Sequence, residues 1–322
     1  MTNPPADTGA STVRPPVLRV WRARSLGLAR YLTGACPIRQ AWFDGHSHLV
    51  ASREGLFAVS PGGFVHLMAG QFFGLAVTAE AIWLFEACDV PALPSRRGRI
   101  LRIDHDGRRL GRARVLVRGL DNGCHQIALE DDVLWVVDTY EQRLHAYDAA
   151  TGASRGEATP VPVVPRTAGR PGYVHMNALT FYNGRPHVLL HMLGRGPSVV
   201  LVLDTGFALT GRFLLPGHMC HDLLFLDDGR LLSCGSAEGT LIDRDGVLAQ
   251  LGEPAQARMT RGLARMDDGG FVVGSSRFGR RWERRSLPGW VHFLDAGFRP
   301  FARLDLPAAP TQIAALPVVQ AR

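Results

Sequence analysis

A short apolar strand recurs six times along the chain, and this recurrence constrains the fold more than any other feature of the sequence. Its copies read FGLAVT from Phe73, HQIALE from His125, MNALTF from Met176, HDLLFL from His221, RGLARM from Arg261 and TQIAAL from Thr311. The second residues of the copies are 74, 126, 177, 222, 262 and 312, so the copies follow one another at intervals of 40 to 52 residues. Grouped short strands at such a period are typical of a β-propeller.

The segments after each of the first five copies contain further strands separated by turns such as DDGR and YNGR. These turns are hairpin signals, and no convincing amphipathic helix separates the repeats. The sixth copy is followed by too little chain for a full blade, whereas residues 48–70 supply strands without a recurring strand before them. We therefore predict an all-β, six-bladed propeller in which N- and C-terminal strands close one blade. A β-sandwich with a second domain is the alternative, but the regular period argues against it.

The charge of the chain comes from arginine alone. All 36 basic residues are arginine, the net charge is +7, and lysine is absent. Without lysine there is no Schiff-base or pyridoxal phosphate anchor and no Walker phosphate loop. The arginine-rich segments contain few aromatic residues that could stack on bases, which argues against a nucleic-acid partner. We expect a small-molecule substrate as the partner, and a monomer or weak dimer.

The cysteines and the N-terminus bear on the compartment. Five scattered cysteines without a CxxC pair indicate free thiols and a reducing environment. Residues 1–16 are polar and proline-rich, which predicts a disordered tail, and residues 17–319 are assigned to a single propeller domain. No run approaches the roughly 18 apolar residues of a membrane helix, so we expect no membrane partner and a cytoplasmic location.

The start of each innermost strand lies near one mouth of a propeller channel, and histidines gather at this level. His125 and His221 directly precede the second residue of their copies, and His175 stands one position earlier in its own copy. Three imidazoles from consecutive blades suit a divalent metal (zinc, copper, iron or manganese) with an open position for substrate. Arg261 holds the same level and could stabilise charge at the reacting centre. His175 needs a bulge to face the channel, and a polar ligand-binding channel without metal is an equal alternative.

Other residues near this mouth complete the set of candidates. Tyr173 could supply a catalytic phenol beside Arg261. Asn177, Asp222 and Gln312 are expected to form hydrogen bonds between blades, and Asn177, Asp222 and Arg277 are the candidates for substrate binding. Cys220 is expected to pack against the neighbouring blade, with a mixed His/Cys site as the less favoured alternative. An excursion at 277–288 could cover the mouth or be a solvated loop.

Several blocks resemble an uncharacterised bacterial propeller family. They are CHQIALEDDVLWVVDT, YVHMNALTFYNGRP, GHMCHDLLFLDDGRLLSCGSAEG, TRGLARMDDGGFVVGSSR and TQIAALP. That family has His-x-Asn-Gly-Leu and Thr-Arg-Gly-Leu blocks, and by resemblance its motif positions fall on His125, His175, Asn177, His221, Arg261 and Arg277. Ala178 replaces the family's glycine, and Cys220-His221-Asp222 replaces a Pro-His-Ser type block. The blades are also similar to NHL-type propellers, among which the amidating lyases hold zinc with three histidines beside an arginine.

Together these features lead to one function hypothesis and two rivals. The hypothesis is a metal-dependent lyase or hydrolase that acts on a small anionic substrate at the mouth of the channel. The first rival is a ligand- or protein-binding propeller without chemistry, and the second is a metal-free synthase or cyclase of the strictosidine-synthase type. The fold alone does not decide between them.

Overall fold

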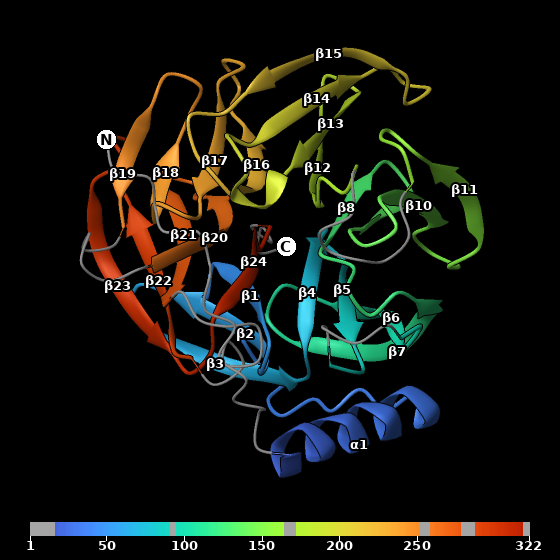
Figure 1. Ribbon diagram of the computed structural model, residues 1–322. Helices are drawn as coiled ribbons and strands as arrows, with labels where there is room; N and C mark the ends of the chain where they lie inside the picture. The colour runs from blue at the N-terminus through green and yellow to red at the C-terminus, as the bar shows by residue number, and fades with distance from the viewer. Residues whose placement is uncertain (1–16, 91–94, 164–171, 252–257, 278–286, 318–322) are drawn as a thin grey trace.

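The chain forms a ring of six antiparallel sheets around a central channel (Figure 1). The computed structural model describes residues 17–90, 95–163, 172–251, 258–277 and 287–317. The predicted tail at 1–16 and most of the excursion at 277–288 lie outside the described residues. Each sheet has four strands, so the predicted six-bladed propeller is confirmed.

The blades follow one another along the chain, and all but the first begin with their innermost strand. Blade 1 contains β24 (Pro310–Ala315), β1 (His48–Ser52), β2 (Gly55–Ser60) and β3 (Gly63–Ala69). Blade 2 contains β4 (Phe72–Val77), β5 (Ala81–Ala87), β6 (Gly98–His105) and β7 (Leu110–Leu120). Blade 3 contains β8 (Gln126–Glu130), β9 (Val133–Asp138), β10 (Arg143–Asp148) and β11 (Ser154–Ala158).

The remaining blades continue the same order. Blade 4 contains β12 (Met176–Tyr182), β13 (Arg185–Leu190), β14 (Val199–Leu203) and β15 (Leu209–Leu214), with a short 3₁₀ turn η1 (Met192–Gly194) after β13. Blade 5 contains β16 (His221–Phe225), β17 (Leu231–Gly235), β18 (Thr240–Ile242) and β19 (Val247–Gln250). Blade 6 contains β20 (Arg258–Arg265), β21 (Phe271–Arg277), β22 (Gly289–Leu294) and β23 (Pro300–Leu306).

Blade 1 closes the ring with strands from both ends of the sequence. The late strand β24 is its innermost member and pairs antiparallel with β1, with Val50 opposite Ile313. All six recurring segments of the sequence therefore form innermost strands, as the repeat predicts.

Apolar side chains fill the seams between neighbouring blades. Each of six buried clusters draws its members from two adjacent blades; Leu49 and Leu75, for example, meet between blades 1 and 2, and Leu232 and Val273 between blades 5 and 6. Burial of apolar surface contributes about 25 cal/mol per Å², so these seams hold the ring together.

A helix that the sequence analysis did not predict precedes the ring. Helix α1 (Val17–Thr33) lies outside blade 2, next to β7 in Figure 1. Its Arg30 forms an ion pair of 2.7 Å with Glu86, and Arg99 forms one of 2.6 Å with the same carboxylate. A Cβ at Gly27 would lie 2.1 Å from the carbonyl oxygen of Cys88, so only glycine permits this approach. No helix within the described residues is long and apolar enough to cross a membrane.

Candidate functional site at one mouth of the channel

Four imidazoles form a row where the innermost strands begin. The ring centroids are 5.0 Å apart for His125 and His175, 4.6 Å for His175 and His191, and 5.1 Å for His191 and His221. His125 is half-buried and the other three are buried. The row spans blades 3, 4 and 5, so the structure brings together the three histidines that the repeat placed at this level and adds a fourth.

Hydrogen bonds at Nδ1 fix the rings of the row. His125 Nδ1 lies 2.7 Å from the carbonyl oxygen of Gly123, and His221 Nδ1 lies 3.0 Å from that of Met219. Because a carbonyl oxygen only accepts, Nδ1 carries the proton in both rings when they are neutral. His221 Nδ1 also lies 2.8 Å from the hydroxyl of Ser236. A ligand of these two rings would therefore bind through Nε2.

His175 reaches the row through the irregularity that the sequence analysis required. The register of β12 with β13 shifts between Met176 and Ala178, which is a bulge at the second residue of the copy. His175 itself has a φ of 58°, in the left-handed region that few non-glycine residues adopt. Its Nδ1 lies 2.9 Å from the hydroxyl of the fully buried Tyr173. Tyr173 therefore orients His175.

His191 is a member of the row that the sequence analysis missed. It follows β13, which runs antiparallel to β12, so the end of β13 lies at the same mouth as the start of β12. The backbone N–H of His191 donates to the carbonyl of His175 over 3.1 Å, and its side chain accepts from the N–H of Leu193. The sequence signal is a histidine directly after the second strand of a blade, whereas the repeat marks only the innermost strand of each blade.

Arg261 continues the ring of residues at this mouth. Its Nε donates to the carbonyl oxygen of Thr311 over 2.9 Å, and its guanidinium carbon lies 5.8 Å from the ring centroid of Phe73. The side chain is buried, with 7% of its surface exposed. One cation therefore shares a buried mouth with the imidazoles.

The surroundings keep His221 neutral. Burial lowers its pKa well below the ordinary 6.5, and the nearby Arg261, His191, His125 and His175 lower it further. A neutral imidazole can act as a base or as a metal ligand at neutral pH. His221 is therefore held in the form that either role requires.

The histidines do not converge on one point. Within the described part of the chain, no three His, Cys, Asp or Glu side chains are placed so that they could share a metal ion. The row is an arc, in which ring contacts join successive members.

Polar residues of the innermost strands bind neighbouring blades to one another. Leu179 N–H donates to Gln126 Oε1 over 2.7 Å and Leu75 N–H to Gln312 Oε1 over 2.7 Å. Gly262 N–H donates to Asp222 Oδ2 over 2.8 Å, and Asn177 Nδ2 donates to the carbonyl of Cys220 over 3.0 Å. These bonds confirm the inter-blade role predicted for Asn177, Asp222 and Gln312.

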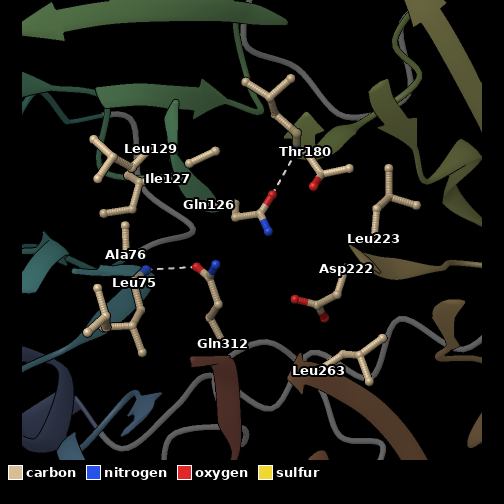
Figure 2. A pocket seen from close by; sticks show the side chains of 13 residues that line it. Leu75, Ala76, Gln126, Ile127, Leu129, Thr180, Asp222, Leu223, Leu263 and Gln312 are labelled. Carbon is tan, nitrogen blue, oxygen red and sulfur yellow. Dashed lines mark hydrogen bonds between the residues drawn. The ribbon is translucent and has the colours of Figure 1, made fainter. Parts of the chain in front are cut away.

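A cavity of about 270 Å³ lies in the channel below the row (Figure 2). Its polar lining is Gln126, Thr180, Asp222 and Gln312, and the rest of the lining is aliphatic. A much smaller cavity adjoins it, with Gln126 and Asp222 in both linings. The lining of the smaller cavity also includes His125, Asn177, His221, Arg261 and Thr311. The smaller cavity has a volume of about 10 Å³, and it places His125 and His221 of the row beside the larger cavity through the lining residues that the two share.

The other candidates lie further from this site or serve its packing. Cys220 is fully buried among apolar side chains of blades 4 and 5, as predicted, and burial raises the pKa of its thiol to about 12. Arg277 ends β21 at the same mouth, where it is exposed, and it does not line either cavity. His218 is partly exposed and pairs with Glu238 at 2.8 Å.

Comparisons with known proteins confirm the fold and leave the family open. No protein-family model matches the sequence, and no curated protein matches it either. The chain is similar to a solved protein of unknown function from Bacteroides caccae, with a TM-score of 0.58, 12% identity and coverage of 85% of this chain and 100% of that one. It is also similar to a chain of the nidogen/laminin complex, with a TM-score of 0.56, 11% identity and coverage of 85% and 99%. A putative gluconolactonase gives a TM-score of 0.51, 12% identity and coverage of 86% and 89%.

Proposed function

We propose that the chain is an enzyme, a hydrolase or lyase, that acts on a small anionic substrate at the histidine-lined mouth of the channel. The observation that carries this proposal is the row of four contiguous imidazoles above a cavity of about 270 Å³. A row of this kind supports a functional site, because neutral imidazoles gathered beside a cavity can act as bases or as metal ligands at neutral pH.

Electrostatics favours an anion at this mouth. Arg261 supplies a buried positive charge there, and the negative charge of Asp222, which lines both cavities, is lost as the pH falls below about 6, the value to which burial raises its pKa. A guanidinium in a buried site binds carboxylate or phosphate groups strongly, and it can stabilise negative charge that develops in a transition state. Arg261 would therefore bind the substrate.

A divalent metal ion is part of this proposal, with His125, His175 and His221 as its ligands. Histidine ligands characteristically form a hydrogen bond through the other ring nitrogen, as all three do through Nδ1. With metal–nitrogen bonds of about 2.0–2.1 Å in a tetrahedral site, imidazole centres lie roughly 5 Å apart. Of the proposed ligands, His125 and His175 have this spacing, at 5.0 Å, whereas His191 lies between His175 and His221. Loading would require the ends of the arc to move inward. A metal supplies an activated water or polarises the bond that breaks.

The chain's own groups have distinct parts in this proposal. Arg261 binds the anionic group, and Tyr173 is a positioning residue that holds His175 through Nδ1. His191, between His175 and His221, is the imidazole outside the proposed ligand set. Its Nδ1 accepts the Leu193 N–H, so the neutral ring carries its proton on Nε2 and can donate a hydrogen bond to the substrate from that atom.

A second candidate function is a binding propeller without chemistry. The arrangement of the row as an arc favours it, since no three side chains in the described residues share a metal-sized position. The similar structures include a putative gluconolactonase and a nidogen/laminin complex, so the shared fold is compatible with both classes.

Elemental analysis of protein purified without an affinity tag separates the two candidates. We expect a near-stoichiometric content of zinc, copper, iron or manganese, which a double His125→Ala/His221→Ala variant loses while its circular dichroism stays that of the wild type. The matched control is His46→Ala/His218→Ala, which alters two histidines outside the row and should keep the metal. No bound metal under any loading condition would contradict the proposal and favour the binding propeller.

A further inference from the structure

Four side chains form a polar collar in the channel, directly below the histidine row. The collar consists of Gln126, Asn177, Asp222 and Gln312, from blades 3, 4, 5 and 1. Each uses one side-chain atom to bond the backbone of the next blade, over 2.7 to 3.0 Å. The other polar atom of each side chain remains for contacts within the channel.

The inter-blade bonds determine which atom each amide presents to the channel. Gln126 and Gln312 accept a backbone N–H through Oε1, so the amide nitrogen is the group turned toward the cavity, as Figure 2 shows. Asn177 is held in the opposite sense, because its nitrogen donates to a carbonyl and leaves Oδ1 as the acceptor. Asp222 bonds Gly262 through Oδ2, and its carboxylate faces the space between the two glutamines. The collar therefore presents two donors and two acceptors.

One of these acceptors has no donor. Asn177 is 3% exposed, and its Oδ1 is a buried atom without a hydrogen-bond partner among the described residues. Buried polar atoms almost always have a partner, which can be a bound molecule or water. Asn177 lines the small cavity of about 10 Å³ with His221 and Arg261, whereas the other three collar residues line the larger cavity. This atom points to a donor group that a ligand brings to the collar.

The mixture of donors and acceptors identifies the chemistry of that ligand. An ammonium group only donates, so it could bind the oxygens of Asn177 and Asp222 but not the amide nitrogens of the glutamines. A carboxylate only accepts, so it could bind the glutamine nitrogens but not those oxygens. A hydroxyl group both donates and accepts, so it can bind either kind of collar atom. An engineered cavity of about 150 Å³ holds a benzene molecule, so the cavity of about 270 Å³ has room for a small ligand.

We propose that the substrate is a small polyhydroxylated anion, whose hydroxyl groups bind the collar while its carboxylate or phosphate group lies at Arg261. The placement of the anionic group at Arg261 rests on the proposed function, whereas the recognition of hydroxyl groups rests on the collar alone. A chain of about five carbons matches the cavity.

Four probes of equal carbon length test this proposal in calorimetric titrations of the whole protein. They are ribonate, ribitol 5-phosphate, ribitol and pentanoate. We expect ribonate, ribitol 5-phosphate or both to bind at least 10-fold more tightly than ribitol and pentanoate. Tighter binding of ribonate would identify the anionic group as a carboxylate, and tighter binding of ribitol 5-phosphate would identify it as a phosphate. Equal binding of pentanoate, or no binding of either hydroxylated anion at millimolar concentration, would overturn the proposal.

Two isosteric variants separate hydrogen bonding from charge. Gln312→Glu keeps an oxygen for the Leu75 N–H and removes a donor from the collar, and Asp222→Asn keeps an oxygen for the Gly262 N–H and removes an acceptor. Both should weaken the better hydroxylated anion by 10-fold or more with little change in melting temperature. If charge alone governed binding, Asp222→Asn would bind the anion more tightly, and that result would contradict hydroxyl recognition.

These titrations do not depend on metal or turnover. Collar binding in a protein that holds no metal would leave this inference standing and remove the proposed metal site. A metal-loaded protein that binds ribonate and ribitol 5-phosphate no more tightly than pentanoate would overturn this inference and leave the proposed metal site standing.

Discussion

Replacing Glu86 with glutamine is expected to lower the free energy of unfolding by about 3–5 kcal/mol. Glu86 lies between Arg30 of α1 and Arg99 of β6, with ion-pair distances of 2.7 and 2.6 Å. The side chain of Arg99 is 0% exposed, so the substitution leaves a buried charge without its counter-ion. Urea unfolding of the two proteins measures the difference.

The matched control is Glu141→Gln. Glu141 pairs with Arg96 at 3.0 Å, but the two side chains are 30% and 67% exposed. An exposed ion pair contributes about 0–1 kcal/mol, so this variant should differ little from the wild type. Equal losses in both variants would show that the buried network does not stabilise the contact of α1 with blade 2.

Gly262→Ala is expected to destabilise the protein by about 2–5 kcal/mol, from two causes that act together. Gly262 has a φ of 89°, and a left-handed conformation costs an L-residue about 1–2 kcal/mol. An added Cβ would also lie 2.7 Å from Cγ1 of Ile313 in blade 1, and such overpacking costs about 1–3 kcal/mol. Calorimetric melting of the variant measures the sum.

Gly269→Ala separates the two causes. Gly269 has nearly the same φ, 87°. A Cβ added there would have the Cβ of Ala296 as its nearest atom, at 3.9 Å, which is an ordinary van der Waals contact. Its substitution should therefore cost only the backbone share, about 1–2 kcal/mol. If Gly262→Ala were no worse than this control, the tight approach of blades 6 and 1 would not constrain the position.

The architecture was predictable because a propeller repeats. Each innermost strand carries the same short pattern, so six copies indicated six blades, and the incomplete copy at Thr311 indicated the closure of blade 1. Helix α1 was not predictable in the same way. Arg24 and Arg30 attach it to Asp89 and Glu86 through ion pairs, and no apolar periodicity reveals such pairs.

The site was predictable to the extent that it follows the repeat. His125 and His221 share a level in their copies and lie in one row. His175 required a bulge and a left-handed backbone that its sequence does not announce, and His191 comes from the end of a second strand. The collar was harder still, because the orientation of Asn177 and of the two glutamines depends on backbone groups of the next blade.

The bulges explain why inner strands carry both structural and chemical groups. The register shifts at the start of β4, β12, β16 and β20, within a few residues of the second position of each copy. A bulge re-aims side chains at the cost of regular pairing. At β4 the bulge ends at Gly74, and at β20 it contains Gly262. At β12 and β16 it contains Asn177 and Asp222, which form hydrogen bonds to the next blade. The same residues therefore hold the ring closed and line its channel.

Side-chain ¹⁵N NMR of the histidines during a zinc titration tests the central claim most directly. The account predicts that the ring nitrogens of His125, His175 and His221 shift together and saturate at one equivalent of zinc, with Nε2 as the atom most affected in His125 and His221. Single His→Gln variants assign the signals. Shifts confined to the partly exposed His218, with the row unchanged, would contradict the claim that this mouth of the channel is the metal-binding and functional site.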